Sequence, residues 1–242
     1  IGVAYQLWML ASGRGRIRIR LRDVRVIPPV MLRLIRVSVG GILQFLIETS
    51  SWIVLVWIIG RFGSAAVAGY TIAVRIIVFT ILPSWGLANS AATLMGQNLG
   101  AGQPDRAEAS VWRAALYNLV FLVAVAAGFI IWAEPMIRIF SADPEVVRSG
   151  VSCLRWISYG YGFFAYGMVM VQAFNGAGDT TTPTIINFFC LWMLQIPMAY
   201  LLAMATDLGI TGVYMAMTAA ESLIAVVGVL VFRRGRWRTR KI

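Results

Sequence analysis

The chain of 242 residues contains no histidine, and only 13% of its residues carry a charge. The missing histidine removes the usual general base at neutral pH and the commonest protein ligand for transition metals. Cysteine is also scarce: Cys153 and Cys190 lie in apolar stretches without a CxxC pair, which indicates small buried side chains. We therefore expect no bound metal and no cofactor.

Apolar residues, in contrast, are abundant. They make up 60% of the chain, and the mean hydropathy is +0.78, well above what is usual for a soluble domain. Apolar runs of about 20 residues recur, and each is long enough to cross a bilayer as a helix. The sequence therefore predicts an all-α polytopic membrane protein, with spans over residues 37–60, 66–95, 110–133, 147–173, 183–206 and 209–232.

Several residues mark where these helices start or bend. Asp143 is followed by a proline, which predicts an N-cap with proline at the first helical position. Asp105, with Glu108 three residues later, resembles a capping box. Pro83 and Pro197 lie inside spans, where the missing backbone donor predicts helix kinks.

The net charge of +11 is unevenly distributed along the chain. With six spans, both ends lie on one side of the membrane, and that side holds sixteen Arg and Lys residues against Arg61, Arg138 and Arg148 on the other. This excess predicts that both ends lie in the cytoplasm and that the protein resides in the plasma (inner) membrane. The basic segment 14–36 favours membrane lipid over nucleic acid as a partner, because basic segments beside spans meet anionic headgroups.

Glu48 lies near the middle of the apolar run 37–60, with no other charge inside it. A carboxylate at the bilayer centre costs at least a few kcal/mol, so such residues usually line a water-filled path and handle an ion or a substrate. Gln44 lies four residues earlier and shares the same helix face. We predict an ion-handling site at Glu48 and Gln44; a hydrogen-bonded pair that only holds helices together is the alternative.

Other polar residues lie inside the predicted spans. Helix rise places Arg75 within about 5 Å of the depth of Glu48, so Arg75 is a candidate ion-pair partner of Glu48 or of Glu221 in the last span. An ion pair of purely structural purpose is the alternative. Asn187, Gln195 and Gln172 are further candidates, although such residues more often form hydrogen bonds between helices.

The aromatic residues fall into two groups. Trp57, Tyr70 and Trp132 lie near span ends and are predicted to be interfacial anchors. Aromatic faces attract lipophilic cations, so others inside the spans are candidates for lining a substrate cavity. These candidates are Trp52, Tyr159, Tyr161, Phe163 and Tyr166.

Two glycine-rich turns carry the most specific pattern. Residues 96–107 read GQNLGAGQPDRA, and residues 175–180 read NGAGDT. Their glycines allow positive φ and close backbone approach, whereas neither turn follows a strand or ends in GK[ST] as a phosphate-binding loop would. Together with their spacing, these turns resemble the multidrug and toxic compound extrusion (MATE) family of efflux antiporters.

The resemblance covers residues 37–232 and implies one six-transmembrane-helix lobe, half of a twelve-helix two-lobe transporter. It implies that residues 1–13 are the tail of a truncated transmembrane helix and that 14–36 form a basic cytoplasmic connection between lobes. Residues 233–242 would be a basic cytoplasmic tail, and a missing N-terminal lobe would be a partner. Glu48 matches the acid that the family carries on its seventh helix. Span 147–173 departs from the sodium-linked members, because it has no acid after its first turn.

The resemblance implies a cation-coupled antiporter, driven by protons or sodium, that exports small organic and often cationic drugs by alternating access. A lipid-linked oligosaccharide flippase of related architecture is one alternative, for which only Arg75 and Arg155 offer cationic side chains inside the spans. An intramembrane enzyme is another, opposed by the missing histidine and the lack of paired acids or a nucleophile elbow. A structural scaffold would leave Glu48 unexplained.

Overall fold

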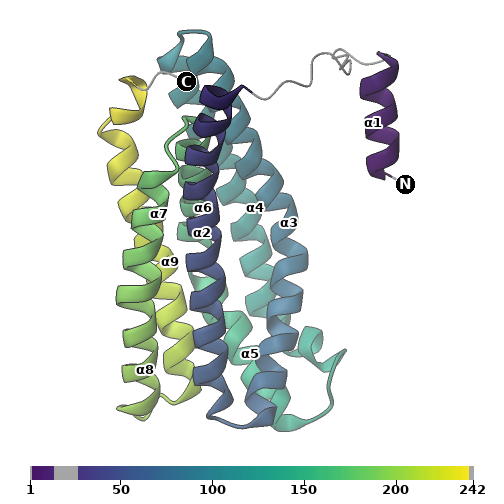
Figure 1. The fold of residues 1–242 in the computed structure, drawn as a ribbon. Helices are drawn as coiled ribbons and strands as arrows, with labels where there is room; N and C mark the ends of the chain where they lie inside the picture. The colour runs from purple at the N-terminus through teal and green to yellow at the C-terminus, as the bar shows by residue number, and fades with distance from the viewer. Residues whose placement is uncertain (1, 14–26, 240–242) are drawn as a thin grey trace. The chain divides into compact units, whose positions relative to one another are not determined.

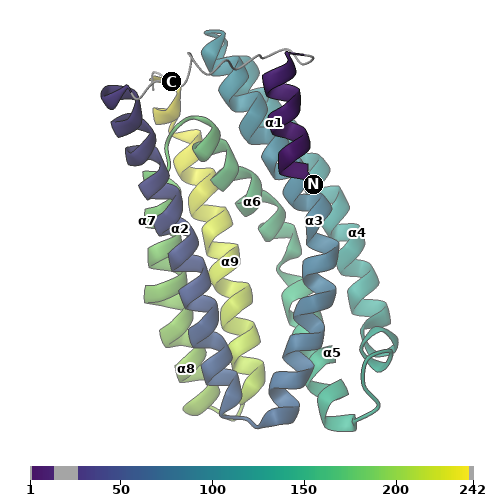
Figure 2. The same cartoon turned by 45° about the vertical axis from the view of Figure 1, so that its right-hand side comes forward.

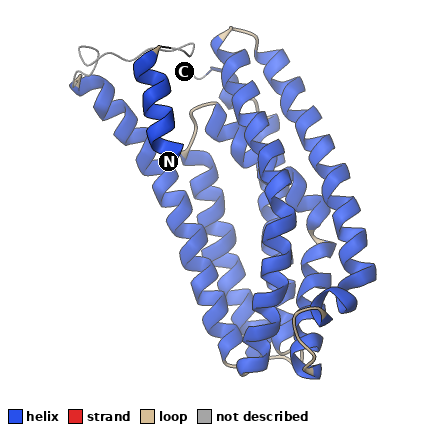
Figure 3. Cartoon of the chain, turned by 90° about the vertical axis from the view of Figure 1, so that its right-hand side faces the viewer, coloured by secondary structure: helices blue, strands red, loops and turns tan. Residues whose placement is uncertain are grey.

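The computed structural model describes residues 2–13 and 27–239, and these residues form helices and turns without a strand (Figure 3). They divide into two compact units, Ile1–Val39 and Gly40–Ile242. The elements are α1 (Gly2–Ser12), α2 (Pro28–Gly60), α3 (Ser64–Gly100), α4 (Pro104–Arg138), α5 (Pro144–Tyr159), α6 (Tyr161–Gly176), α7 (Thr181–Asn187), the π-helix η2 (Phe188–Gln195), α8 (Ile196–Met204), α9 (Ile210–Arg233) and the 3-10 helix η3 (Arg236–Thr239).

Five stretches of described helix are long and apolar enough to cross a membrane, which confirms an all-α polytopic membrane protein. They are Ser38–Gly60, Ser64–Gly100, Pro104–Arg138, Thr181–Met204 and Ile210–Arg233. The fourth predicted span, 147–173, is instead divided at Gly160 into α5 and α6, with 16 residues each (Figure 2). The division lies where α9 approaches closely, since a Cβ on Gly160 would lie 2.9 Å from Cγ2 of Thr218.

The helix boundaries correct some of the sequence-based expectations. Helix α2 begins at Pro28, nine residues before the predicted start, so the last part of the basic segment 14–36 is helical; residues 14–26 lie outside the described part of the chain. The N-cap at Asp143 is confirmed, because its Oδ1 accepts hydrogen bonds from the backbone N–H groups of Glu145 (2.8 Å) and Val146 (3.4 Å). The capping box at Asp105 is wrong, because α4 starts after Gln103, whose side chain makes no capping hydrogen bond.

Within Gly40–Ile242, α3 packs against α4, α5 and α6, while α9 packs against α5, α6 and α8. Helices α7 and α8 follow one another in a single column beside α9 (Figure 1). Small residues permit two of the close crossings. A Cβ on Gly176 of α6 would lie 2.7 Å from Cα of Ala92 in α3, and a Cβ on Gly212 of α9 would lie 2.7 Å from the carbonyl carbon of Leu202 in α8. Small residues at such crossings are typical of packed membrane helices.

The glycine-rich turns end α3 and α6. Gly102 and Gly178 adopt φ of 69° and 73°, a region that favours glycine. After the second turn, the carboxylate of Asp179 accepts hydrogen bonds from the backbone N–H (3.1 Å) and the hydroxyl (2.7 Å) of Thr182, at the start of α7. Both patterns are therefore turns that terminate helices, as their sequence predicts.

The proline positions have different outcomes. Helix α3 continues through Pro83 as one helix, so the kink at Pro83 stays a prediction. Pro197 lies in the first turn of α8, directly after the π-helix η2, so the irregularity precedes the proline. The clear break is in α4, where Trp132 has non-helical angles (φ −106°, ψ 19°) three residues before Pro135. A proline inside a helix lacks the N–H that would bond the preceding turn, which accounts for this break.

The C-terminal segment is more ordered than the predicted basic tail 233–242. Trp237 is buried, stacks on Phe232 with ring centroids 5.0 Å apart, and donates its indole N–H to the carbonyl oxygen of Phe232 at 2.9 Å. Arg238 forms ion pairs with Glu108 and, at 3.0 Å, with Asp105, both in the first turns of α4. These acids raise the pKa of Arg238, with the hydrogen bond to Glu108 as the larger cause. The segment thus joins the end of α9 to the start of α4.

Candidate functional site

A polar cavity of about 1100 Å³, including the space at its open mouth, lies between α2, α3, α6, η2 and α9. Helix α2 contributes one face to it, because Gln44, Glu48, Ser51, Trp52 and Leu55 follow helical spacing. The sequence alone predicts this shared face for Gln44 and Glu48. The polar residues that line the cavity are Gln44, Glu48, Ser51, Gln172, Asn187, Gln195 and Glu221.

Glu48 is held by the opposite wall of the cavity. The side-chain N–H of Asn187, at the end of α7, donates a hydrogen bond of 2.7 Å to Oε1 of Glu48. Glu48 itself is exposed to the cavity, whereas Asn187 and Gln44 are only 3% and 9% exposed. The amide oxygens of Gln44 and Asn187 are buried and accept no hydrogen bond from the described residues. The site therefore presents a carboxylate and two amide oxygens that lack a donor.

Two further hydrogen bonds fix α2 against its neighbours beside Glu48. Ser51 donates its hydroxyl hydrogen to Oε1 of Gln195 in η2 (3.2 Å), and both side chains are buried. Trp192 of the same π-helix donates its indole N–H to the carbonyl oxygen of Ile47 (3.3 Å). The π-helix thus presents Gln195 to the cavity and Trp192 to the backbone of α2. Such π segments in helices often occur at functional sites.

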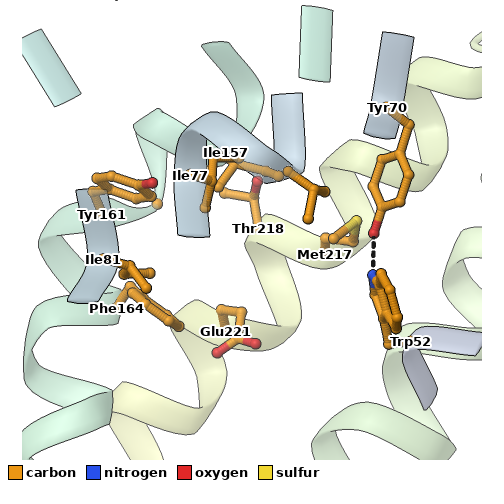
Figure 4. A pocket seen from close by; sticks show the side chains of 12 residues that line it. Trp52, Tyr70, Ile77, Ile81, Ile157, Tyr161, Phe164, Met217, Thr218 and Glu221 are labelled. Carbon is orange, nitrogen blue, oxygen red and sulfur yellow. Dashed lines mark hydrogen bonds between the residues drawn. The ribbon is translucent and has the colours of Figure 1, made fainter. Parts of the chain in front are cut away.

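An apolar pocket of about 650 Å³ borders the polar cavity and shares Trp52, Phe164, Met217 and Glu221 with it, among others. Figure 4 shows its aromatic walls, with the indole N–H of Trp52 donating to the hydroxyl of Tyr70 at 2.7 Å. The carboxylate of Glu221 lies among these apolar side chains (Figure 4). An apolar wall with a few polar groups is typical of small-molecule sites in proteins.

Glu221 and Glu48 come from the last and the first of the helices around the cavity, and both line it. Glu221 is half-buried. The sequence predicts Arg75 as a partner of one of these acids, but the structure does not bring them together. Arg75 is exposed, lines neither cavity, and forms no ion pair within the described part of the chain. Similar depth along two helices does not place two side chains on facing sides.

The aromatic candidates divide between the two cavities and the outer surface. Trp52 and Tyr161 line the apolar pocket, in agreement with the prediction that they line a cavity. Tyr159 is exposed and lies in a separate basic pocket, while Phe163 and Tyr166 border a third pocket beside Trp112. These three therefore do not line the cavity; Phe163 and Tyr166 lie two and five residues after Tyr161 in α6, so helix geometry turns them toward another face.

Sequence reasoning missed several cavity residues. Tyr70 is predicted as an interfacial anchor, yet it is buried and bonded to Trp52. Trp57 and Trp132, the other predicted anchors, are exposed. Gln195 reads as a polar residue between helices, and Phe164 is one apolar residue among many. From the sequence, Ser51 could have been identified as a cavity residue only because it lies three residues after Glu48 and so shares its helix face.

The comparisons with known proteins agree with this architecture. The family model MatE matches residues 41–201, well over half of the chain. The Thermotoga maritima protein named probable multidrug resistance protein NorM is 27% identical over 180 residues, covering 74% of this chain and 39% of that protein. YpnP of Bacillus subtilis, also named a probable multidrug resistance protein, is 21% identical over 209 residues, covering 86% and 46%. The chain thus spans less than half the length of these two relatives.

A solved structure of a MOP superfamily transporter from Pyrococcus furiosus superposes with a TM-score of 0.88 at 22% identity. The match covers 96% of this chain and 52% of that one, and that protein is described with a binding pocket of reverse polarity that suggests a different function. This likeness shows the fold alone, namely one half-length lobe. The family match includes Glu48, Asn187 and Gln195 of the polar cavity. With its membrane-spanning helices and its glycine-rich turns, the chain belongs to the MATE family of transporters.

Proposed function

We propose that the chain forms one wall of a cation-coupled antiporter that exports small organic, often cationic, compounds by alternating access. The polar cavity supports this, because it is lined by Glu48 and Glu221 and by no arginine or lysine among the described residues. A carboxylate pair beside aromatic side chains suits an organic cation, since acids attract its charge and aromatic faces attract it further. The absence of cationic lining is the observation that carries the choice of substrate class.

The flippase alternative is less well supported by this lining. A lipid-linked pyrophosphate needs cationic side chains in its path, and the two candidates in the sequence are Arg75 and Arg155. Arg75 is exposed away from the cavity, and Arg155 lines a different pocket. The acidic lining would repel the pyrophosphate group. The two relatives are named probable multidrug resistance proteins and the solved structure is described as a transporter, so we propose a transport role without a catalytic residue.

We propose that Glu48 is the residue that binds the coupling ion, with Gln44, Asn187 and Glu221 around it. A carboxylate that takes up a proton gains an O–H donor and keeps an oxygen that can accept the hydrogen bond from Asn187. A sodium ion would instead be bound by oxygens, and the amide oxygens of Gln44 and Asn187 lie unpaired at the same site. The geometry is compatible with either ion. Efflux that depends on a pH gradient would indicate proton coupling, and efflux that depends on a sodium gradient would indicate sodium coupling.

The test is the Glu48→Gln variant in everted vesicles that contain this lobe together with a complementary lobe. The substitution keeps the shape and hydrogen bonding of the side chain but cannot ionise, so ion-driven efflux of a fluorescent organic cation should be lost at pH 6 to 8. The matched control is Asp207→Asn, which removes an exposed acid outside the polar cavity. Coupled efflux by Glu48→Gln at the wild-type rate would show that Glu48 is only structural.

We also propose that this lobe alone does not transport, because the cavity has an open mouth that a second lobe would close. Vesicles that contain only residues 1–242 should show no gradient-driven uptake, while the two-lobe protein does. Robust flux through the single lobe would contradict this proposal, unless crosslinking shows that two copies associate.

We further propose that both ends face the cytoplasm of the plasma membrane, which reporter fusions after Ile242 and within residues 134–146 would test.

A further inference from the structure

A second polar pocket lies outside the transport cavity, where the kinked end of α4 meets α5. Its empty volume is about 1010 Å³ including its open side, and it is lined by residues from the last turns of α4 and from one face of α5. Three of these residues are arginines, Arg138, Arg148 and Arg155, and one is an acid, Glu134. None of them lines the polar cavity, so this pocket requires an explanation other than transport.

The helix α5 presents these groups in one row. Arg148, Ser152, Arg155 and Tyr159 are spaced by three or four residues and therefore share a helix face. The opposite side of α5 is buried in the protein, through residues such as Val146, Cys153 and Leu154. The burial of that apolar side fixes the rotation of the helix, so the basic row faces outward by necessity. The row is a consequence of tertiary packing and is built on a rigid element.

The arginines differ in whether they are already neutralised. Arg138 donates from Nε and Nη2 to Oε1 of Glu134, both at 2.8 Å, and this exposed pair lies beyond the break at Trp132. Arg148 and Arg155 are exposed and form no ion pair or hydrogen bond with the described residues. The pocket therefore carries two guanidinium groups whose charge the protein leaves uncompensated.

The depth of these arginines makes their lack of a partner significant. Arg155 lies eleven residues after Pro144, so it is about 16 Å along α5 from the start of the helix, whereas Arg148 is about 6 Å from it. A cation beside membrane helices at such a depth must be paired or must extend to the polar interface. Trp156 and Tyr159, with ring centroids 5.6 Å apart, line the same pocket. Tryptophan and tyrosine favour the headgroup level of a bilayer.

We propose that this pocket, between α4 and α5, binds an anionic phosphate group, of the kind carried by the headgroup of an anionic phospholipid. Guanidinium groups match phosphate oxygens with two parallel hydrogen bonds each, and Arg148 and Arg155 lie on the same face at about 10 Å along the helix. The hydroxyl of Ser152 lies between them in the row as a further donor. Trp156 and Tyr159 offer apolar faces to the acyl chains or the glycerol.

The test measures lipid retained by the detergent-purified chain in native mass spectrometry. Phosphatidylglycerol is compared with phosphatidylcholine of identical acyl chains, with the wild type, an Arg148→Gln/Arg155→Gln variant, and an Arg61→Gln control. Arg61 is an exposed arginine that stacks on Trp57 at 4.2 Å and does not line the pocket. We expect preferential retention of phosphatidylglycerol by the wild type and by the control. The double variant should lose roughly tenfold in affinity per arginine, as expected for charge-assisted hydrogen bonds.

The Arg155→Lys variant tests whether binding needs only the positive charge or also the geometry of the guanidinium. Lysine keeps the charge but cannot donate two parallel hydrogen bonds, so the lipid affinity of this variant should lie between those of the wild type and Arg155→Gln.

Competition with millimolar inorganic phosphate distinguishes a lipid headgroup from a free phosphate ion as the ligand. Displacement of the lipid shows that the pocket accepts the free anion too, and no displacement shows that it needs the lipid; both support a phosphate site. Equal retention of both lipids by the wild type, or unchanged retention by the double variant, would overturn the proposal. Should the double variant fail to elute as a folded species, Arg155→Gln alone gives the same comparison.

Discussion

The crossing of α3 and α5 offers a sharp test of the packing, through the substitution Gly69→Ala. Gly69 is buried, and a Cβ built on it would lie 2.5 Å from the carbonyl oxygen of Val146 and 2.7 Å from the backbone nitrogen of Gly150. Both atoms belong to the backbone of α5, so neither can rotate away as a side chain would. The substitution therefore has to displace one helix relative to the other.

The size of this displacement follows from the distances. Ordinary contacts of a Cβ begin at 3.4 Å, so relief of the 2.5 Å contact requires a shift of about 0.9 Å (3.4 − 2.5). Overpacking of this kind typically costs about 1–3 kcal/mol, while the better helix propensity of alanine returns less than about 1 kcal/mol. The displacement would also disturb the hydrogen bond from Ser149 to the carbonyl oxygen of Ala66 (3.3 Å) at the same crossing.

The assay is thermal unfolding of the purified protein in detergent, followed by intrinsic fluorescence. A loss of 1–3 kcal/mol in a chain of this size should lower the transition by roughly 2–12 °C. The control is Gly86→Ala in the same helix, which is exposed and has no atom within 4 Å of its Cβ position. That substitution should be neutral or slightly stabilising, because alanine restricts the unfolded chain. Equal transition temperatures for Gly69→Ala and Gly86→Ala would refute the close crossing of α3 and α5.

Two further predictions concern polar and terminal contacts. Asn118 is fully buried and donates to the carbonyl oxygen of Ala165 at 3.0 Å, so Asn118→Leu should destabilise the fold by about 1–3 kcal/mol in the same unfolding assay; an unchanged transition would contradict this bond. At the C-terminal segment, Trp237→Ala should accelerate proteolytic removal of the segment strongly, because the buried indole stacks on Phe232 and bonds to its carbonyl oxygen. Arg238→Gln should have a much smaller effect, since its ion pairs are exposed and such pairs contribute little; a larger effect than that of Trp237→Ala would contradict this ranking.

The residues of the candidate site show how far sequence reasoning reaches. Glu48 and Gln44 stand out because a charged residue inside an apolar run is costly wherever the run folds, and their spacing of four sets a common face. Arg75 stands out for the same reason, yet the structure places it on the outside. A span pattern determines depth along a helix but leaves the rotation of that helix about its axis open. For this reason the predicted pairing of Arg75 does not appear in the structure.

The broken span over residues 144–176 shows a second limit. Its composition is apolar enough to predict one continuous helix, and the glycine at position 160 is unremarkable among the 23 glycines of the chain. What makes Gly160 special is its contact with Thr218 in α9, 58 residues away (218 − 160). The sequence within the span does not show this contact, so it does not show where the span divides.

The sequence by itself determined the membrane class, the approximate helix limits, the turns that end α3 and α6, and the family, and it singled out Glu48 as a candidate. Each of these depends on properties of neighbouring residues, such as hydropathy, spacing and turn chemistry. The tertiary structure alone decided which groups surround Glu48. Asn187, which donates to Glu48 at 2.7 Å, lies 139 residues away in the chain. Helix rotation and crossing depend on contacts summed over the whole bundle, so no local pattern specifies them.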